Sequence, residues 1–138
     1  MDPESTLPHW RDPRTALHYA RASVQVGLWT SERVLAHRHL PKQGRILELG
    51  CGAGRISLGL WREGWHDLTP TDISPEMVGL ADGVFAQEGC PLRAEQADAR
   101  ALAYPERTFV GAIFGFNGLM CIPGRARRRE ALVEIRRV

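Results

Sequence analysis

The sequence lacks the features that mark secreted, metal-binding and membrane-spanning proteins. Its three cysteines, Cys51, Cys90 and Cys121, are far apart and form no C-x-x-C pair, so we expect no zinc or other metal site and no disulfide framework. They favour a reducing, cytoplasmic compartment. The N-terminus shows no basic region followed by an apolar one, which argues against a secretory signal. The longest uncharged run, 108–124, is too short and too rich in glycine to span a bilayer, so we expect no membrane partner.

Lysine is nearly absent, because Lys42 is the one lysine among 18 basic residues. The formal net charge of +2 is too small to favour a nucleic-acid partner. Arginines gather in the last segment, 125–138, where we expect an amphipathic helix over 127–138 with an apolar face of Ala131, Leu132, Ile135 and Val138. That pattern is typical of a helix that packs on one side and is solvated on the other, so a nucleic-acid role is disfavoured.

The remaining pattern predicts one α/β domain. The chain has 138 residues, of which 43% are hydrophobic and 25% charged, as in ordinary globular proteins. We expect an N-terminal arm with two helices over 1–40, the second capped by Ser31 with Val34 and Leu35 on one face. Strands alternating with helices follow in 41–138, which predicts a parallel sheet of about four strands. The expected strands are 45–49, 67–72, 92–97 and 109–116.

Two local signals in the second half of this alternation carry particular weight. Ser74, Pro75 and Glu76 are typical of a helix start, with a capping hydroxyl, a proline at the first position and an acid in the first turn. Pro70 interrupts the second strand and cannot donate a hydrogen bond to a neighbour, which predicts a short or distorted strand.

A glycine-rich turn stands between the first strand and the next helix, in the order Glu48, Gly50, Gly52, Gly54. Glycines here allow a tight reversal and a close approach of the backbone to a ligand, which then faces the amides of the helix start. The dinucleotide fingerprint G-x-G-x-x-G requires a third glycine at position 55, where this sequence has Arg55. The alternative that the chain is an NAD-dependent oxidoreductase is therefore disfavoured.

The segment I-L-E-L-G-C-G-A-G-R, residues 46–55, resembles the class I S-adenosylmethionine-dependent methyltransferase family in its small-molecule branch. The resemblance implies a Rossmann-like fold with N-terminal lid helices, S-adenosylmethionine as cofactor and a small-molecule acceptor that is methylated by in-line displacement. The expected cofactor contacts in this segment are Glu48, Gly50, Cys51, Gly52, Gly54 and Arg55.

Three further segments supply expected contacts beyond the turn. An acid about 20 residues past such a turn holds ribose hydroxyls, and Asp72 occupies that place. The resemblance also assigns Ile73 to the adenine face and Asp98 and Ala99 to the adenine edge. It places Phe116 and Asn117 by the sulfonium and the acceptor. The competing interpretations are a helix cap for Asp72, an Asx-turn for Asp98 and an ordinary loop position for Asn117.

No catalytic residue can be identified from the sequence. The histidines of the N-terminal region are candidates for a general base, and the aromatic residues there for a lid that excludes water. These candidates are His9, His18, His37, His39, Tyr19 and Trp29.

The resemblance covers the first four strands of the family's sheet, so the chain is expected to be truncated within the family's fold. The alternative function is an S-adenosylmethionine-binding or interaction protein without catalysis, because the acceptor half would be missing. An apolar fourth strand at an open edge also predicts a homo-oligomer.

Overall fold

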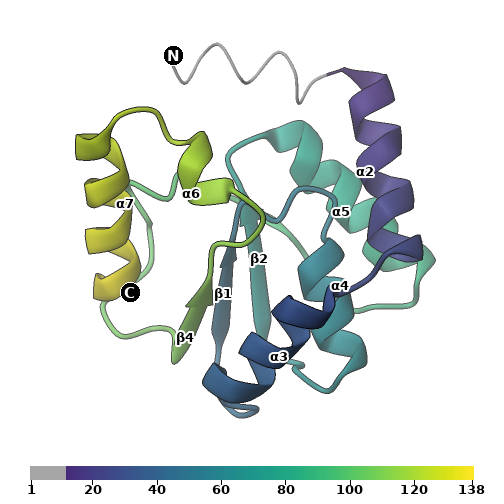
Figure 1. Cartoon of the computed structure of the whole chain (residues 1–138), viewed down its shortest axis with the longest axis horizontal. Helices are drawn as coiled ribbons and strands as arrows, with labels where there is room; N and C mark the ends of the chain where they lie inside the picture. The colour runs from purple at the N-terminus through teal and green to yellow at the C-terminus, as the bar shows by residue number, and fades with distance from the viewer. Residues whose placement is uncertain (1–11) are drawn as a thin grey trace.

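A four-stranded parallel sheet lies at the centre of the computed structural model, which describes residues 12–138. The strand order is β3-β2-β1-β4, so β1 and β2 are central and β4 lies beside β1 (Figure 1). The strands are β1 (Ile46–Leu49), β2 (Leu68–Asp72), β3 (Glu95–Gln96) and β4 (Gly111–Ile113). The parallel α/β fold predicted from the alternating pattern is confirmed.

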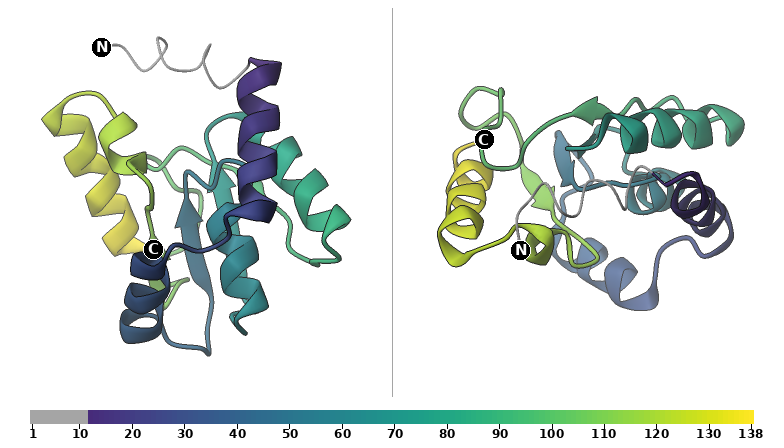
Figure 2. Two further views of the ribbon diagram at one scale, coloured as in Figure 1. Left: turned by 45° about the vertical axis from the view of Figure 1, so that its right-hand side comes forward. Right: turned by 90° about the horizontal axis from the view of Figure 1, so that it is seen from above.

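Helices cover both faces of the sheet, with α2, α4 and α5 on one side and α7 on the other (Figure 2). None in the described range is long and apolar enough to cross a membrane. The helices are α2 (Pro13–Gln25), α3 (Thr30–His39), α4 (Arg55–Arg62), α5 (Pro75–Gln87), the short α6 (Gly118–Cys121) and α7 (Arg125–Arg137).

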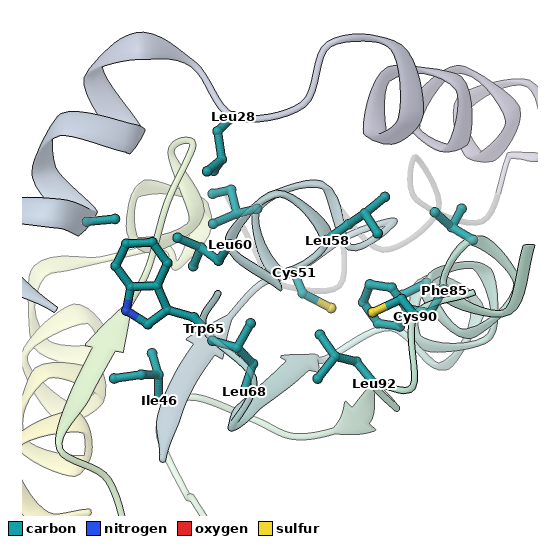
Figure 3. Packing of buried hydrophobic residues seen from close by; sticks show 14 residues of the cluster. Leu28, Ile46, Cys51, Leu58, Leu60, Trp65, Leu68, Phe85, Cys90 and Leu92 are labelled. Atoms are coloured by element: carbon teal, nitrogen blue, oxygen red, sulfur yellow. The ribbon is translucent and has the colours of Figure 1, made fainter. Parts of the chain in front are cut away.

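Strand β1 is buried along its whole length, as expected for the centre of a parallel sheet. Ile46 packs into the cluster shown in Figure 3, together with Leu58, Leu60 and Phe85 from α4 and α5. Leu47 and Leu49 face the opposite side, where they meet the 97–110 segment and α7. Each large apolar side chain buried here contributes about 1.5–3 kcal/mol, so the β1 end that carries the glycine-rich turn is rigidly held.

The expectation of a short or distorted second strand is wrong, because β2 has five residues and pairs with β1 over four positions. The carbonyl of Asp67 accepts a hydrogen bond from Ile46 of β1, and that of Thr71 accepts one from Cys51, just beyond β1. The carbonyl of Asp72 instead accepts one from Ala97, just beyond β3. Successive residues of β2 therefore direct their backbone groups alternately toward β1 and toward β3, and the nitrogen of Pro70 points away from β1. Strand β3 pairs only with Thr71 and Asp72, so the missing donor of Pro70 breaks no pairing with it.

The third and fourth strands are shorter than the predicted 92–97 and 109–116. Before β3, the amide of Ala94 donates to the carboxylate of Asp82 on α5 and so leaves the sheet. Before β4, the amide of Phe109 donates to the carbonyl of Val138. After β4, Phe116 adopts a φ of 45°, which ends the extended backbone. The amides of Ala94 and Phe109 thus bond to partners distant in the chain, although the apolar pattern had assigned both residues to strands.

Two helices differ from their predicted form. Helix α3 is capped at Trp29, whose amide donates to the Glu32 carboxylate at 2.9 Å, so Ser31 is not the cap. Its buried residue is Ala36, while Val34 and Leu35 are exposed. Ala131 on α7 and Val138 at its C-terminal cap are buried as predicted, but Leu132 is exposed. The predicted start of α5 is confirmed, because the Ser74 hydroxyl accepts from the Met77 amide.

Candidate functional site

The carboxyl ends of the four strands meet along one edge of the sheet and border a cavity of about 450 Å³. That volume lies in the usual range for small-molecule sites. Following the sheet order, the cavity is reached by Asp98 after β3, Asp72 at the end of β2, Gly50 after β1 and Phe116 after β4. Helix α2 and the α6 region complete the wall.

The glycines of the turn after β1 have different surroundings, although all three have positive φ angles. A Cβ atom added to Gly52 would meet no atom within 4 Å, so this residue presents bare backbone to open space. A Cβ atom on Gly54 would lie 2.6 Å from the buried ring of Phe85. Gly52 is therefore suited to ligand approach, whereas Gly54 is needed for packing.

Asp72 is tied to the same turn. One carboxylate oxygen accepts from the Gly52 amide at 2.9 Å, and the other accepts from the Ser74 amide at 2.9 Å. Burial raises the pKa of Asp72. Because Ser74 caps α5, Asp72 is not the helix cap, and its oxygens keep further lone pairs for a ligand.

Glu48 lies beneath the turn and turns its carboxyl group toward α4. It accepts from the Ser57 amide at 3.1 Å and from the Ser57 hydroxyl. Burial raises the pKa of Glu48 to about 7. Burial likewise raises the pKa of the Cys51 thiol well above its ordinary value, so Cys51 is a protonated packing residue at neutral pH. Glu48 thus holds the first turn of α4 in place through its hydrogen bonds with Ser57.

Asp98 and Ala99 line the cavity at the β3 end. The Asp98 carboxylate accepts from the Arg100 amide at 2.9 Å and from the Arg100 guanidinium at 2.6 Å. The hydrogen bond from the Arg100 side chain lowers the pKa of Asp98. The geometry includes the Asx-turn that the sequence left open for Asp98, and it adds Arg100 as a neighbour that no motif indicated.

Most of the predicted contact residues are brought together around this cavity, and their roles in binding stay predictions. Gly54 and Asn117 do not line it. Gly54 packs against Phe85, and Asn117, with a φ of 62°, precedes α6 on the exposed surface. The predicted residues that line the cavity are Glu48, Gly50, Cys51, Gly52, Arg55, Asp72, Ile73, Asp98, Ala99 and Phe116.

The N-terminal candidates divide between the cavity and the surface. His18, Tyr19 and Trp29 line the cavity, whereas His37 pairs with Glu63 away from it. His39 is exposed outside the cavity lining, and His9 lies outside the described residues. Sequence reasoning missed the lining residues Ala22, Ser23, Val26, Cys121, Ile122 and Pro123. These residues belong to no motif, and they come from two segments far apart in the chain that only the folded structure brings together.

No cluster suited to a metal ion occurs within residues 12–138, where no group of three or more His, Cys, Asp or Glu side chains converges. The cavity is instead bordered by bare backbone, hydrogen-bonded carboxylates and aromatic rings. This composition is suited to an organic ligand with hydroxyl groups and a flat ring.

Comparison with known proteins gives one family model, described as a methyltransferase domain, that matches residues 46–138. The chain is 33% identical over 73 residues to an eEF1A lysine and N-terminal methyltransferase homolog of Drosophila melanogaster, covering 53% of this chain and 11% of that protein. It is similar to a structure from work on the conversion of a disulfide bond into a thioacetal group during echinomycin biosynthesis (27% identity, TM-score 0.71), covering 81% of this chain and 45% of that one.

A second solved structure is similar in fold. It is CalS10 with bound S-adenosylmethionine, described as an amino pentose methyltransferase from Micromonospora echinaspora. The identity is 20% and the TM-score 0.68, covering 90% of this chain and 50% of that one. The chain thus spans about a tenth of the Drosophila protein and about half of the two solved structures.

Proposed function

The chain belongs to the methyltransferase domain family, and from this premise we propose that it binds S-adenosylmethionine at the strand ends and transfers the methyl group to an acceptor. The observation that carries the proposal is the pairing of the open Gly52 backbone with the Asp72 carboxylate, 2.9 Å away, inside a cavity of about 450 Å³. It is the combination that a nucleoside with vicinal hydroxyl groups requires.

Taken in order from β3 to β4, the residues that line the cavity fit successive parts of this cofactor. Asp72 would accept hydrogen bonds from the ribose hydroxyls, and Ile73, Asp98 and Ala99 would surround the adenine. Gly50 and Gly52 would lie along the methionine part, and Phe116 would border the reacting end. S-adenosylmethionine supplies an electrophilic methyl group on a positively charged sulfur. The chain's own contribution is to orient the reactants and to exclude water with Trp29 and Phe116.

The proposed acceptor is a small molecule. The cavity extends between α2 and the α6 region, where Ala22, Val26 and Ile122 add apolar wall next to Trp29 and Phe116. The likeness to an amino pentose methyltransferase supports this class. The likeness to an eEF1A lysine methyltransferase homolog supports a protein lysine as the second candidate acceptor.

Proton handling at the acceptor would fall to α2. Tyr19 and His18 both line the cavity. Burial and the nearby Cys121 raise the pKa of Tyr19, so its phenol is protonated at neutral pH and is suited to donate a hydrogen bond. His18 is exposed and would be the group that accepts a proton.

Calorimetric titration tests the cofactor, and labelled methyl transfer tests the acceptor. We expect the chain to bind S-adenosylhomocysteine and not NAD; binding of NAD alone would contradict the proposal. Labelled S-adenosylmethionine would then be offered with amino sugars, phenols and lysine peptides. Label on a small molecule and not on the peptides is expected, and label on the peptides alone would move the function to protein methylation.

The proposed division of the chain follows from the same site. Residues 1–40 would form an arm and lid over a cofactor-binding unit of residues 41–138. In support, Tyr19 and Trp29 of the described part of this segment line the cavity, and Leu28 and Ala36 anchor the segment to the core. A cytoplasmic location remains a proposal that rests on the cysteine pattern.

A further inference from the structure

Arg55 is the first residue of α4, directly after the glycine-rich turn, yet its side chain reaches back to the N-terminal segment. Its guanidinium donates to the carbonyl of Gly27 at 2.7 Å. It also forms a two-pronged contact with the Glu32 carboxylate at 2.5 and 2.6 Å. The side chains of Arg55 and Glu32 are only 14% and 18% exposed, so water screens this pair weakly.

The Glu32 carboxylate serves a second partner in the same turn. It accepts from the backbone amide of Trp29 at 2.9 Å, which sets the start of α3. Arg55 therefore holds the connection between α2 and α3 at both ends, at Gly27 and at Glu32, with Trp29 between them. This connection crosses in front of α4 in Figure 1.

Trp29 in turn meets Phe116 from the opposite side of the cavity. Their ring centroids are 5.2 Å apart in an edge-to-face arrangement. The Arg55 guanidinium lies 5.2 Å from the Trp29 ring centroid and 5.8 Å from that of Phe116. Trp29 and Phe116 are 45% and 53% exposed, so few other contacts hold this aromatic wall in place.

We propose that Arg55 is a positioning residue that couples ligand binding at the glycine-rich turn to closure of the Trp29–Phe116 wall. A ligand bound at the turn lies next to Arg55, and the two-pronged contact joins Arg55 to the α2–α3 connection. The wall stands at the β4 end of the row of strand ends, where the acceptor would enter. The identity of the ligand in this proposal rests on the proposed function. The proposal gives Arg55 an indirect role in place of the direct cofactor contact expected from the sequence.

Trp29 itself reports on the proposed coupling. The chain has four tryptophans, so acrylamide quenching is measured on each variant and on its Trp29→Phe counterpart, and the difference isolates Trp29. In the parent chain, S-adenosylhomocysteine is expected to protect Trp29 from quenching. In Arg55→Ala, Trp29 is expected to be more quenchable without ligand and to stay so at saturating ligand, with binding about tenfold weaker, as is usual for coupled sites.

Two further variants sharpen the test. Arg55→Lys keeps the charge but loses the two-pronged contact, so it is expected to fall between the parent and Arg55→Ala and serves if Arg55→Ala does not fold. Arg62→Ala removes an exposed ion pair with Glu88 at the other end of α4 and is expected to change neither quenching nor affinity.

Two results would overturn the proposal. One is unchanged quenching of Trp29 in both Arg55 variants. The other is weaker binding with full protection of Trp29 at saturation, which would make Arg55 a direct ligand contact. Failure of the parent chain to bind S-adenosylhomocysteine would overturn the proposed function and with it the coupling, whereas the ligand-free quenching comparison separately tests whether Arg55 holds the wall.

Discussion

Glu48 and Asp72 are two carboxyl groups of the same motif region with different tasks. Glu48 is buried with 2% of its surface exposed and is satisfied by Ser57 on α4. Asp72 is only partly buried and ties the Gly52 amide at the cavity. The first is placed to support the fold, and the second is placed to meet a ligand.

Glu48 should make stability fall as the pH rises. Its folded pKa of about 7 lies above the ordinary 4.5, so the folded state keeps a proton that the unfolded state loses between these values. The stabilisation is complete below about pH 4.5 and is lost as the pH rises through 7, in total about 3 kcal/mol. Urea unfolding at pH 5 and pH 8 should show this loss in the parent and not in Glu48→Gln.

Glu106 is exposed, so Glu106→Gln serves as the control and should keep the pH dependence of stability seen in the parent. An equal loss of stability between pH 5 and pH 8 in the parent and in Glu48→Gln would show that another group is responsible.

Asp72→Ala should weaken binding of S-adenosylhomocysteine by about 1.5–3 kcal/mol, because hydrogen bonds to a charged group are lost. Calorimetry measures the change. Asp82→Ala is the matched control, since that carboxylate also ties a backbone amide, at Ala94, but lies outside the cavity lining. Equal affinity in the parent and Asp72→Ala would remove Asp72 from the site, and Asp98→Ala should cost less than Asp72→Ala.

At the scale of elements, the glycine-rich turn divides its work among its members. The Gly54 position meets Phe85 of α5, while the Gly52 position opens into the cavity. The same turn therefore joins two helices to the sheet and leaves one stretch of bare backbone for a ligand.

A pair of alanine substitutions separates these roles. Gly54→Ala should destabilise the fold by about 2–4 kcal/mol, from overpacking against Phe85 and from the left-handed backbone. Gly52→Ala carries only the backbone cost of about 1–2 kcal/mol but should lose ligand binding, because the methyl group enters the cavity. Thermal unfolding and calorimetry on both variants give the comparison, and a Gly52→Ala chain that binds as well as the parent would contradict it.

At the scale of the whole molecule, the sheet ends at β4 in residues 12–138, since β4 pairs there with β1 alone. Val110, next to this edge, is 56% exposed, and a groove runs from it to Ile135 and Val138 of the α7 segment. Apolar strand edges favour pairing with another chain.

We expect the 138-residue chain to self-associate through β4 as its concentration rises. Val110→Lys should reduce this association without loss of helix content, because a charge at an edge opposes pairing. Val34→Lys places the same charge at an equally exposed valine of α3 and should leave it unchanged. Light scattering measures both, and a parent chain that stays monomeric at high concentration would contradict the prediction.

The sequence alone determined the parallel α/β order, the capped start of α5 at Ser74 and the glycine-rich turn after β1. Each of these depends on residues close together in the chain, where periodicity, capping and φ preferences act locally. For the same reason Asp72 could be expected at the end of the second strand.

Only the tertiary structure decided which groups these residues meet. Gly54 is needed because Phe85 lies against it. The Arg55 guanidinium pairs with Glu32 and Gly27 because both lie within its reach. Strand β3 is short because the amide of Ala94, just before it, donates its hydrogen bond to the Asp82 carboxylate. These partners are between 12 and 31 positions apart in the chain, so no local pattern encodes them, and packing selects them only when the sheet and helices come together.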